Sequence, residues 1–336
     1  MVYWTLYIMS KHEHRKHTRI LSVGAAVQDV FLQGKIFKPH KDCDGDMIEE
    51  FELGSKNDID GVIFSTGGGA TNASVTFARQ GLHAMYLGKV GDDVAGRAIL
   101  DDLHKDGVDT SLVGLSNNGY GSGFSCILLA PSGERTILAY RGASAHYSIK
   151  TADFHDTKPE WIYLTSLDGN FEVLHTVFAY AQQHNIKIAF NPGKKELAQK
   201  AELKKLIPKL TILSMNKQEM QSLYKGETLE ELVRAANKDV HYVVVTDGPK
   251  GAMAADRWHI VKAGMYENVP VVDRTGAGDA FSSGFTAMIA AGEPLEWAVT
   301  YASANSTRVV SKIGAKAGII HIDDVVHEMP LKVKEM

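Results

Sequence analysis

Short apolar runs alternate with amphipathic segments along most of this 336-residue chain, and this alternation constrains the fold more than any other feature. Each run has the length and continuous apolar character of a strand buried on both faces of a parallel sheet. The segments between the runs carry apolar side chains at helical spacing: Ala95, Ile99 and Leu103 share one helix face, which Gly107 can close. The pattern predicts a doubly wound, mostly parallel α/β sheet with right-handed crossovers. Its expected strands are Ile20–Gly24, Ala84–Gly88, Trp161–Thr165, Ile186–Phe190, Leu210–Ser214 and Tyr242–Thr246.

Two segments, 31–65 and 112–141, interrupt this rhythm. The first holds short apolar patches between turn residues, and the second reads as hairpin strands Ser122–Leu129 and Thr136–Tyr140 around a Pro-Ser-Gly turn. We expect the two segments to form a small antiparallel β lid beside the carboxyl edge of the main sheet. Open α/β folds bind their ligands at that edge, so the lid is expected to cover a ligand site.

The two lid segments interrupt one expected core, residues 19–330. Residues 1–18 begin with nine mostly apolar residues and continue with a basic patch, which is the reverse of a secretory signal. We expect these residues to be a disordered extension, with Met9 as an alternative translation start.

The composition excludes several other classes of protein. Hydrophobic residues make up 44% and charged residues 23%, as in ordinary globular proteins, which argues against disorder and coiled coils. The net charge of −4 argues against nucleic acid as a partner, and no apolar run approaches the ~20 residues of a membrane span. Two cysteines, Cys43 and Cys126, are too few for a disulfide framework and fit a cytoplasmic location.

The most informative motif is Asp273-Arg274-Thr275-Gly276-Ala277-Gly278-Asp279, which precedes an apolar helical segment. Glycines before a helix expose backbone N–H groups, and the helix dipole adds partial positive charge, so the motif predicts an anion site. Asp279 in the first turn could accept a proton from a hydroxyl that attacks a phosphoryl group held there. An ordinary glycine turn followed by a dipole-favoured Asp is the alternative interpretation.

Four further segments agree with the anion site, because each follows an expected strand at the sheet edge where ligands bind. They are 65–72, with three consecutive glycines, then 88–93, 216–219 and 246–252. Asn216 and Glu219 in the third segment also have the spacing of a helix capping box, so a purely structural role is open for that pair.

Together these motifs resemble the ribokinase (PfkB) family of carbohydrate and nucleoside kinases, from about Arg19 to about Val326. The segment 273–279 resembles its C-terminal signature D-x-x-G-A-G-D, 67–96 its N-terminal signature, and 216–219 its N-x-x-E motif. The resemblance implies a ribokinase-like fold and ATP-dependent phosphorylation of a primary hydroxyl of a furanose sugar or nucleoside. ATP is then the co-substrate and Mg²⁺ the cofactor.

The resemblance also implies roles for matching residues. Asp279 would be the base, and Gly276, Ala277 and Gly278 the anion hole. Glu219 would organise Mg²⁺ through water. The implied nucleotide-binding residues are Asn216, Thr246, Gly248 and Gly251. The implied acceptor-binding residues are Asp29, Gly68, Gly69 and Asn72.

A monovalent cation, potassium in particular, often binds beside the anion hole in this family. Asp273 and Thr275 stand where such ligands come from, together with carbonyls of 309–318. Gly318 occupies the place of a ligating serine of ribokinases, which leaves potassium dependence open.

Arg141 ends a lid strand and returns toward the expected acceptor site. It is either a residue of the lid surface or one that recognises an anion, since a guanidinium pairs with carboxylate or phosphate. Kinases of 2-keto-3-deoxygluconate are similar at this place, so a sugar acid or sugar phosphate is the alternative acceptor. A non-catalytic sugar- or nucleotide-binding regulator is the alternative from another functional class.

Because lids of this kind expose apolar faces and strand edges, we expect a homodimer through the lid.

Overall fold

The computed structural model describes residues 15, 17–116, 119–131, 134–146, 148–150, 154 and 157–336. Most of the expected extension, residues 1–14 and 16, lies outside the described residues. The same holds for Ser132 and Gly133 of the expected lid turn.

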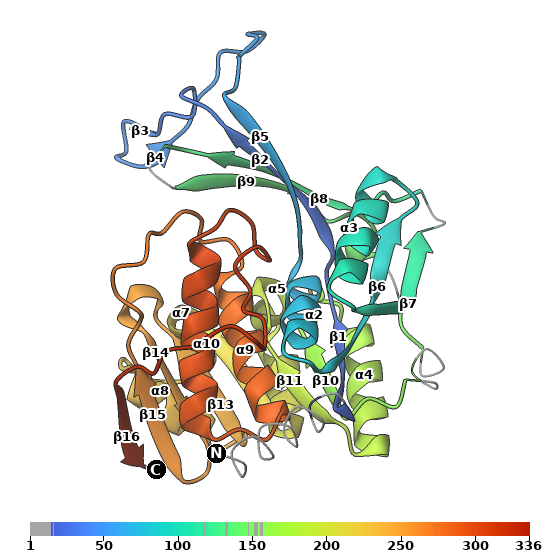
Figure 1. The fold of residues 1–336 in the computed structure, drawn as a ribbon, viewed down its shortest axis with the longest axis vertical. Helices are drawn as coiled ribbons and strands as arrows, with labels where there is room; N and C mark the ends of the chain where they lie inside the picture. The colour runs from blue at the N-terminus through green and yellow to red at the C-terminus, as the bar shows by residue number, and fades with distance from the viewer. Residues whose placement is uncertain are drawn as a thin grey trace.

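A ten-stranded sheet forms the centre of the molecule, in the order β16-β15-β14-β13-β12-β11-β10-β1-β6-β7 (Figure 1). The seven strands from β13 to β7 are parallel, and β14 to β16 add an antiparallel edge. The predicted fold class is therefore confirmed. In chain order the strands are Arg19–Val23 (β1), His83–Gly91 (β6), Asp109–Ser116 (β7), Trp161–Leu164 (β10), Lys187–Phe190 (β11), Ile212–Asn216 (β12), Tyr242–Thr246 (β13), Ala252–Ala255 (β14), His259–Ala263 (β15) and Leu331–Glu335 (β16).

Helices cover both faces of this sheet, and each face has its own buried apolar cluster. The first cluster lies under Gly69–Arg79 (α2), Val94–Lys105 (α3), Ala277–Ala290 (α9) and Leu295–Val310 (α10). The second lies under Phe171–His184 (α4), Lys194–Ala198 (α5), Lys200–Leu206 (α6), Lys217–Leu223 (α7) and Leu229–Ala236 (α8). Strand β1 has β6 on one side and β10 on the other, so the strand order reverses there, which is where open α/β sheets bind ligands.

A second, four-stranded sheet stands above the carboxyl edge of the first, and we call it the lid sheet (Figure 1). Its order is β5-β2-β8-β9, with Gly61–Gly67 (β5), Val27–Gln33 (β2), Gly123–Leu129 (β8) and Arg135–Tyr140 (β9). Two of its pairings are antiparallel, and the central one, β2 with β8, is parallel.

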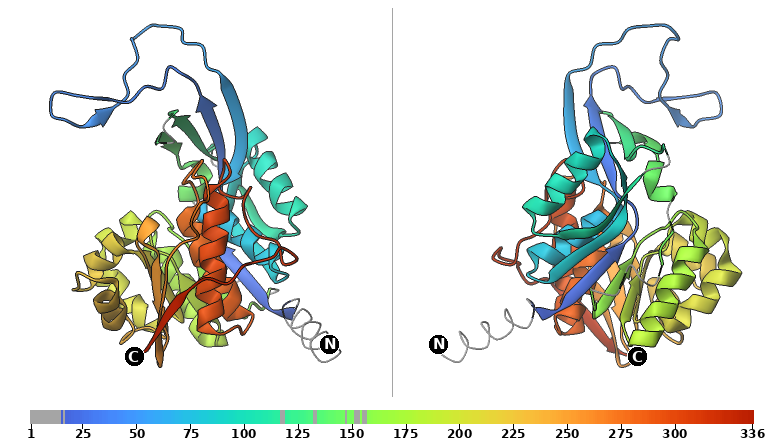
Figure 2. Two further views of the ribbon diagram at one scale, coloured as in Figure 1. Left: turned by 60° about the vertical axis from the view of Figure 1, so that its left-hand side comes forward. Right: turned by 90° about the vertical axis from the view of Figure 1, so that its right-hand side faces the viewer.

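The lid sheet and the expected lid segments differ at two places. The segment 112–141 starts inside β7, which belongs to the main sheet, and β2 begins before residue 31. Residues 34–60 leave the lid sheet as a long excursion with one small hairpin, His40–Lys41 (β3) and Met47–Ile48 (β4), visible at the top of Figure 2.

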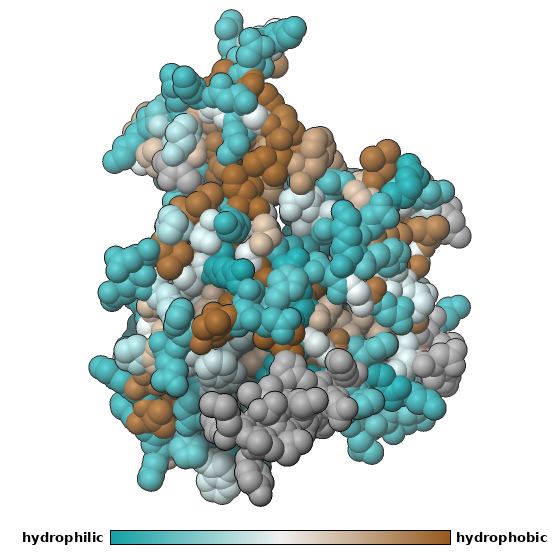
Figure 3. Space-filling model, in the orientation of Figure 1, coloured by the Kyte–Doolittle hydropathy of each residue, from teal (hydrophilic) through white to brown (hydrophobic). Residues whose placement is uncertain are grey.

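The two faces of the lid sheet differ in character. Asp29, Ser65 and Ser125 lie side by side on the inner face, which turns toward the core. Val30 is buried on the outer face. Figure 3 shows apolar side chains gathered in the upper part of the molecule, below its hydrophilic tip. The exposed members of this outer apolar face are Val62, Phe64, Phe124, Leu138 and Tyr140.

None of the helices in the described part of the chain combines the length and the apolar character needed to cross a lipid bilayer.

Candidate active site

Asp279, the expected base, lies in the first turn of α9; the residue is partly exposed, and its carboxyl group is desolvated. Its Oδ2 accepts a hydrogen bond from Nδ2 of Asn72 in α2 at 2.8 Å. Burial raises the pKa of Asp279, and the hydrogen bond from Asn72 opposes that rise. The Oδ1 of Asn72 is buried and has no hydrogen-bond partner among the described residues, so it is an acceptor left for a ligand hydroxyl.

The expected anion hole is the start of α9. Gly276 precedes the helix in the left-handed region, with φ of 77°, and Ala277 and Gly278 open it. A Cβ on Gly276 would lie 2.4 Å from the Cβ of Ala315, so only glycine fits this close approach. The first N–H groups of a helix have no acceptor within it; the Ala277 N–H donates to the carbonyl oxygen of Arg274 in the preceding turn at 3.3 Å.

Three of the four expected nucleotide residues border a cavity of about 210 Å³ between β13, α9 and α10, and Asn216 is not among the residues that line it. Thr246, Gly248 and Gly251 line it together with Ala277 and Gly278, so it joins the anion hole directly. Sequence reasoning missed the rest of its wall, because helical spacing alone does not tell which residues of α9 and α10 face a ligand. These residues include Met265, Val271, Phe281, Ser303, Ser306, Thr307 and Val310.

Asn216 and Glu219 form the reciprocal capping box of α7. The Glu219 N–H donates to Asn216 Oδ1 at 2.9 Å, and the Asn216 N–H donates to Glu219 Oε2 at 3.0 Å. Burial raises the pKa of Glu219, the Asn216 hydrogen bonds and the nearby charge of Lys194 lower it, and Asp279 raises it further. The pair is thus a helix cap in the same electrostatic neighbourhood as the expected base.

The family resemblance implies Mg²⁺, which would be bound largely by the phosphates of the nucleotide rather than by side chains. No group of three or more His, Cys, Asp or Glu side chains in the described part of the chain could hold a metal ion. Glu219 is partly buried, and Asp279 and Lys194 both act on it electrostatically. An ion there would therefore rely on phosphate oxygens and water, with Glu219 behind the water, as Mg²⁺ commonly does.

Asp29, the expected acceptor residue, lies on the inner face of β2 and is 5% exposed. Burial is the main reason that the pKa of Asp29 rises to about 6; Ser125 and Lys316 lower it, and Asp273 and Asp279 raise it. A Cβ on the neighbouring Gly67 would lie 2.2 Å from the Asp29 carboxylate.

Gly68 and Gly69 start α2 beside the strand-order reversal. A Cβ on Gly68, whose φ is 101°, would lie 2.3 Å from the carbonyl oxygen of Ala25, and one on Gly69 would lie 3.0 Å from Thr165. Close packing within the protein therefore accounts for both glycines. Thr165 was missed by sequence reasoning, although its buried hydroxyl has no partner among the described residues and faces this junction.

Arg141 is exposed at the end of β9. It precedes the short helical turn Gly142–Ala145, and its side chain makes no capping hydrogen bond there.

Asp273 and Thr275 form a compact turn before α9. Oδ1 of Asp273 accepts from the N–H of Thr275 at 2.9 Å and from its hydroxyl at 2.7 Å, and Oδ2 accepts from the N–H of Gly314 at 3.0 Å. Gly318 packs against the chain at Arg308, where a Cβ would lie 2.2 Å from the carbonyl oxygen. A ligating serine therefore could not replace Gly318 without movement of the backbone.

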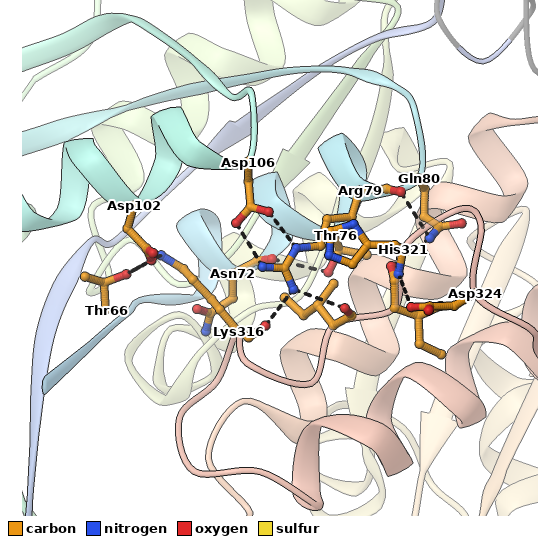
Figure 4. Close-up of polar contacts among 12 residues, drawn as sticks. Thr66, Asn72, Thr76, Arg79, Gln80, Asp102, Asp106, Lys316, His321 and Asp324 are labelled. Carbon is orange, nitrogen blue, oxygen red and sulfur yellow. Dashed lines mark hydrogen bonds and ion pairs between the residues drawn. The ribbon is translucent and has the colours of Figure 1, made fainter. Parts of the chain in front are cut away.

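A polar network ties the segment after α10 to the other elements of the site (Figure 4). The buried ammonium of Lys316 donates to Oγ1 of Thr66 at 2.7 Å and lies 3.3 Å from Oδ2 of Asp102. Arg79 in α2 pairs with Asp106 and also donates to the carbonyl oxygen of Lys316 at 2.9 Å. This segment also carries Ala315, which abuts Gly276, so the network fixes the backbone next to the anion hole.

Comparison with known proteins shows the family of the chain. The sequence profile of pfkB family carbohydrate kinases matches residues 44–322. The ribokinase of Bacillus subtilis is 29% identical over 264 residues, which are 77% of this chain and 86% of that protein. The 5-dehydro-2-deoxygluconokinase of B. subtilis is 24% identical over 262 residues, 73% of this chain and 81% of that protein.

Among solved structures, the ribokinase of Arabidopsis thaliana complexed with ribose and ATP superposes with a TM-score of 0.75 at 21% identity. The match covers 91% of this chain and 96% of that one, and it establishes the shared fold. Both the profile match and the fold confirm the predicted resemblance. The chain belongs to the pfkB family of carbohydrate kinases, phosphotransferases that act on sugar hydroxyls.

Proposed function

We propose that this protein transfers the γ-phosphoryl group of ATP to the primary hydroxyl of a neutral furanose, free or as part of a nucleoside. The observation that carries the proposal is the position of Asp279. Its carboxylate is buried in the first turn of α9, held by Asn72, and next to the cavity lined by Ala277 and Gly278.

The reaction follows from this arrangement. ATP would occupy the cavity with its terminal phosphates toward the first N–H groups of α9, including those of Ala277 and Gly278. The hydroxyl oxygen of the acceptor forms a bond to the γ-phosphorus, and the bond from that phosphorus to the bridging oxygen of ADP breaks. The hydroxyl proton passes to the carboxylate of Asp279. Such transfer needs positioning and charge neutralisation more than covalent chemistry from the protein.

Magnesium would neutralise the phosphate charge when it is bound with ATP. Glu219 would orient water around it and Asn216 would hold Glu219 in place. Thr246, Gly248 and Gly251 would contact the nucleotide along the cavity wall. Asp273 and Thr275 would form the turn that leads into the anion hole.

The acceptor would lie between the lid sheet and the start of α2. Asp29 and the free Oδ1 of Asn72 offer acceptors for sugar hydroxyls, with Gly68 and Gly69 at the same junction. Because Asp29, Asp273 and Asp279 act on one another electrostatically, the site disfavours an anionic acceptor. The exposed Arg141 is the feature that favours the alternative, a sugar acid or sugar phosphate.

An ADP-release screen tests the proposal with ribose, fructose, common nucleosides, 2-keto-3-deoxygluconate and ribose 1-phosphate as acceptors. We expect the highest kcat/KM with a neutral furanose, and an Arg141→Ala variant within about threefold of the wild type, as for an exposed charge. A preference for an anionic acceptor, with KM raised tenfold to about a hundredfold by Arg141→Ala, would favour the alternative. Binding of sugar and nucleotide without ADP release would favour a non-catalytic regulator.

We further propose that the protein works in the cytoplasm as a homodimer, with the outer apolar face of the lid sheet buried between subunits. Exposed Phe64, Leu138 and Tyr140 support this, since contiguous apolar surface commonly marks an interface. In this organisation residues 19–330 are one catalytic core, and the lid is the part that pairs.

A further inference from the structure

A charged side chain of the lid sheet lies next to the turn that precedes α9. Arg135, the first residue of β9, pairs with Leu129 and shares the inner face of the lid sheet with Asp29. Its Nε is 3.9 Å from Oδ1 of Asp273. That Nε is buried and has no hydrogen-bond partner among the described residues, so the guanidinium is held there without another acceptor for this nitrogen.

The carboxylate of Asp273 requires positive charge at this place. Its side chain is fully buried, and its hydrogen bonds come from the uncharged groups of Thr275 and Gly314. In the described part of the chain, Arg135 is its sole ion-pair partner. A buried charge without compensation is costly, so the contact with Arg135 has an evident role.

The ligand set for a small cation is reduced at the same turn. Gly318 offers no hydroxyl, and the carbonyl oxygen of Arg308 leaves no room for a Cβ there. The carboxylate of Asp273 is already engaged by three donors. While Arg135 is in place, the residues present therefore fit a monovalent cation poorly, because its guanidinium stands beside the group that such a cation would neutralise.

We propose that Arg135 takes the place of a monovalent cation: its guanidinium compensates Asp273 and holds the turn that leads into the anion hole. Arg135 is thus a positioning residue, and the enzyme turns over without potassium. The inference rests on the proposed function, because the turn matters for catalysis only if the start of α9 receives the phosphoryl group. A nearby second pair, Glu134 with Arg274 at 3.5 Å, joins the same strand and turn, but it is exposed and adds little.

The experiment compares wild type, Arg135→Gln, and Arg97→Gln as a control from an exposed ion pair in α3. For each protein, the Tm and the rate of ADP release are measured in potassium chloride and in tetramethylammonium chloride at equal ionic strength. We expect wild type and Arg97→Gln to behave alike in both salts. Arg135→Gln should lose about tenfold to a hundredfold in kcat in tetramethylammonium chloride, as for a lost charge-assisted contact, and potassium should restore activity and raise its Tm.

Two results would overturn the inference. One is a wild type that potassium activates or stabilises relative to tetramethylammonium. The other is an Arg135→Gln variant whose kcat and Tm equal those of the wild type in both salts. If Arg135→Gln does not fold, the wild type alone decides, because indifference to potassium supports the inference and dependence overturns it. If no acceptor is phosphorylated, the proposed function fails, whereas the melting comparison still decides the role of Arg135.

Discussion

At the scale of single residues, three buried carboxylates share the site, and each is stabilised differently. Asn72 donates to Asp279, backbone N–H groups and Arg135 surround Asp273, and Ser125 and Lys316 act on Asp29. Burial, together with the charges of Asp273 and Asp279, raises the pKa of Asp29 to about 6 against the lowering effect of Ser125 and Lys316. Asp29 therefore changes its protonation state close to neutral pH.

The first prediction concerns Asp279→Asn. The amide retains the size of the side chain and can still accept from Asn72, but it cannot accept the hydroxyl proton. We expect kcat to fall by about 10²–10⁴-fold, the range for loss of a general base, with nucleotide affinity unchanged. Coupled ADP release and calorimetric ATP binding measure the two quantities. Retention of more than about a tenth of the wild-type kcat would exclude Asp279 as the base.

The second prediction concerns the pH dependence of stability. The folded-state pKa of Asp29 is raised from 3.8 to about 6, so its protonated form stabilises the fold at low pH, and this contribution is lost as the pH rises through about 6. Asp29→Asn does not titrate. Between pH 5 and pH 8, the free energy of unfolding of the wild type should therefore fall by about 1.4 kcal/mol relative to that of Asp29→Asn.

Urea unfolding at both pH values measures this gain, with the exposed carboxylate of Asp101 in α3 replaced by Asn as the control. A constant difference between wild type and Asp29→Asn across this pH range would show that Asp29 titrates as an ordinary carboxylate.

At the scale of elements, the start of α9 is fixed by its neighbours rather than by a capping side chain. Ser306 in α10 donates to the carbonyl oxygen of Ala277 at 2.9 Å, and Asn305 donates to that of Ala280. Ala315 presses against Gly276 from the segment that Lys316 anchors. The anion hole is thus assembled from α9, α10 and the segment after them, and its geometry depends on contacts between these elements.

The third prediction separates this packing from backbone conformation. Gly276→Ala introduces both a positive φ for alanine and a Cβ 2.4 Å from Ala315. Gly292→Ala is a matched control, because its φ is 76° and its Cβ would meet nothing within 4 Å. We expect Gly292→Ala to lose about 1 kcal/mol of stability with normal kcat, and Gly276→Ala to lose more stability and most of its activity. Equal effects of the two changes on Tm and kcat would rule out the packing argument.

At the scale of the whole molecule, the sequence predicted the parts that repeat a strong local pattern. The six expected parallel strands all appear as strands, with ends that differ by a few residues, because continuous burial gives each an unmistakable apolar run. The antiparallel edge was missed, since β14 is rich in small alanines and β16 alternates as an exposed strand. Strand β7 was assigned to the lid for a related reason: its residues are only partly buried, so it lacks that run.

The motifs predicted which segments lie together better than they predicted the contacts between those segments. Ala277 and Gly278 do line one cavity with Thr246, Gly248 and Gly251, because each segment follows a strand that ends at one sheet edge. The contact of Arg135 with Asp273 depends on the register of two lid strands and on how the lid sheet lies over the core. No local pattern encodes that arrangement.

The fourth prediction concerns assembly. Phe64 is 71% exposed and Leu138 is 58% exposed on the outer face of the lid sheet. If two lids pair there, Phe64→Asp and Leu138→Asp should each convert a dimer into monomers, because a carboxylate would be buried without a partner. Sedimentation velocity measures the mass, and Val325→Asp, at an exposed valine outside the lid sheet, is the control. A monomeric wild type would argue against the proposed dimer.

The parallel pairing at the centre of the lid sheet also bears on the order in which the chain folds. Strand β2 pairs with β8, so Val27 meets Gly123 only after the intervening β6, α3 and β7 have been accommodated. Closing so long a loop costs entropy that only later contacts repay, which makes such pairings slow to form. During refolding, amide protons of β1 and β6 should therefore become protected from exchange before those of β2 and β8. Pulse-labelling measures this order, and simultaneous protection of both strand pairs would contradict it. Asp29 on β2, the expected acceptor residue, would accordingly reach its place only after β1 and β6 have paired.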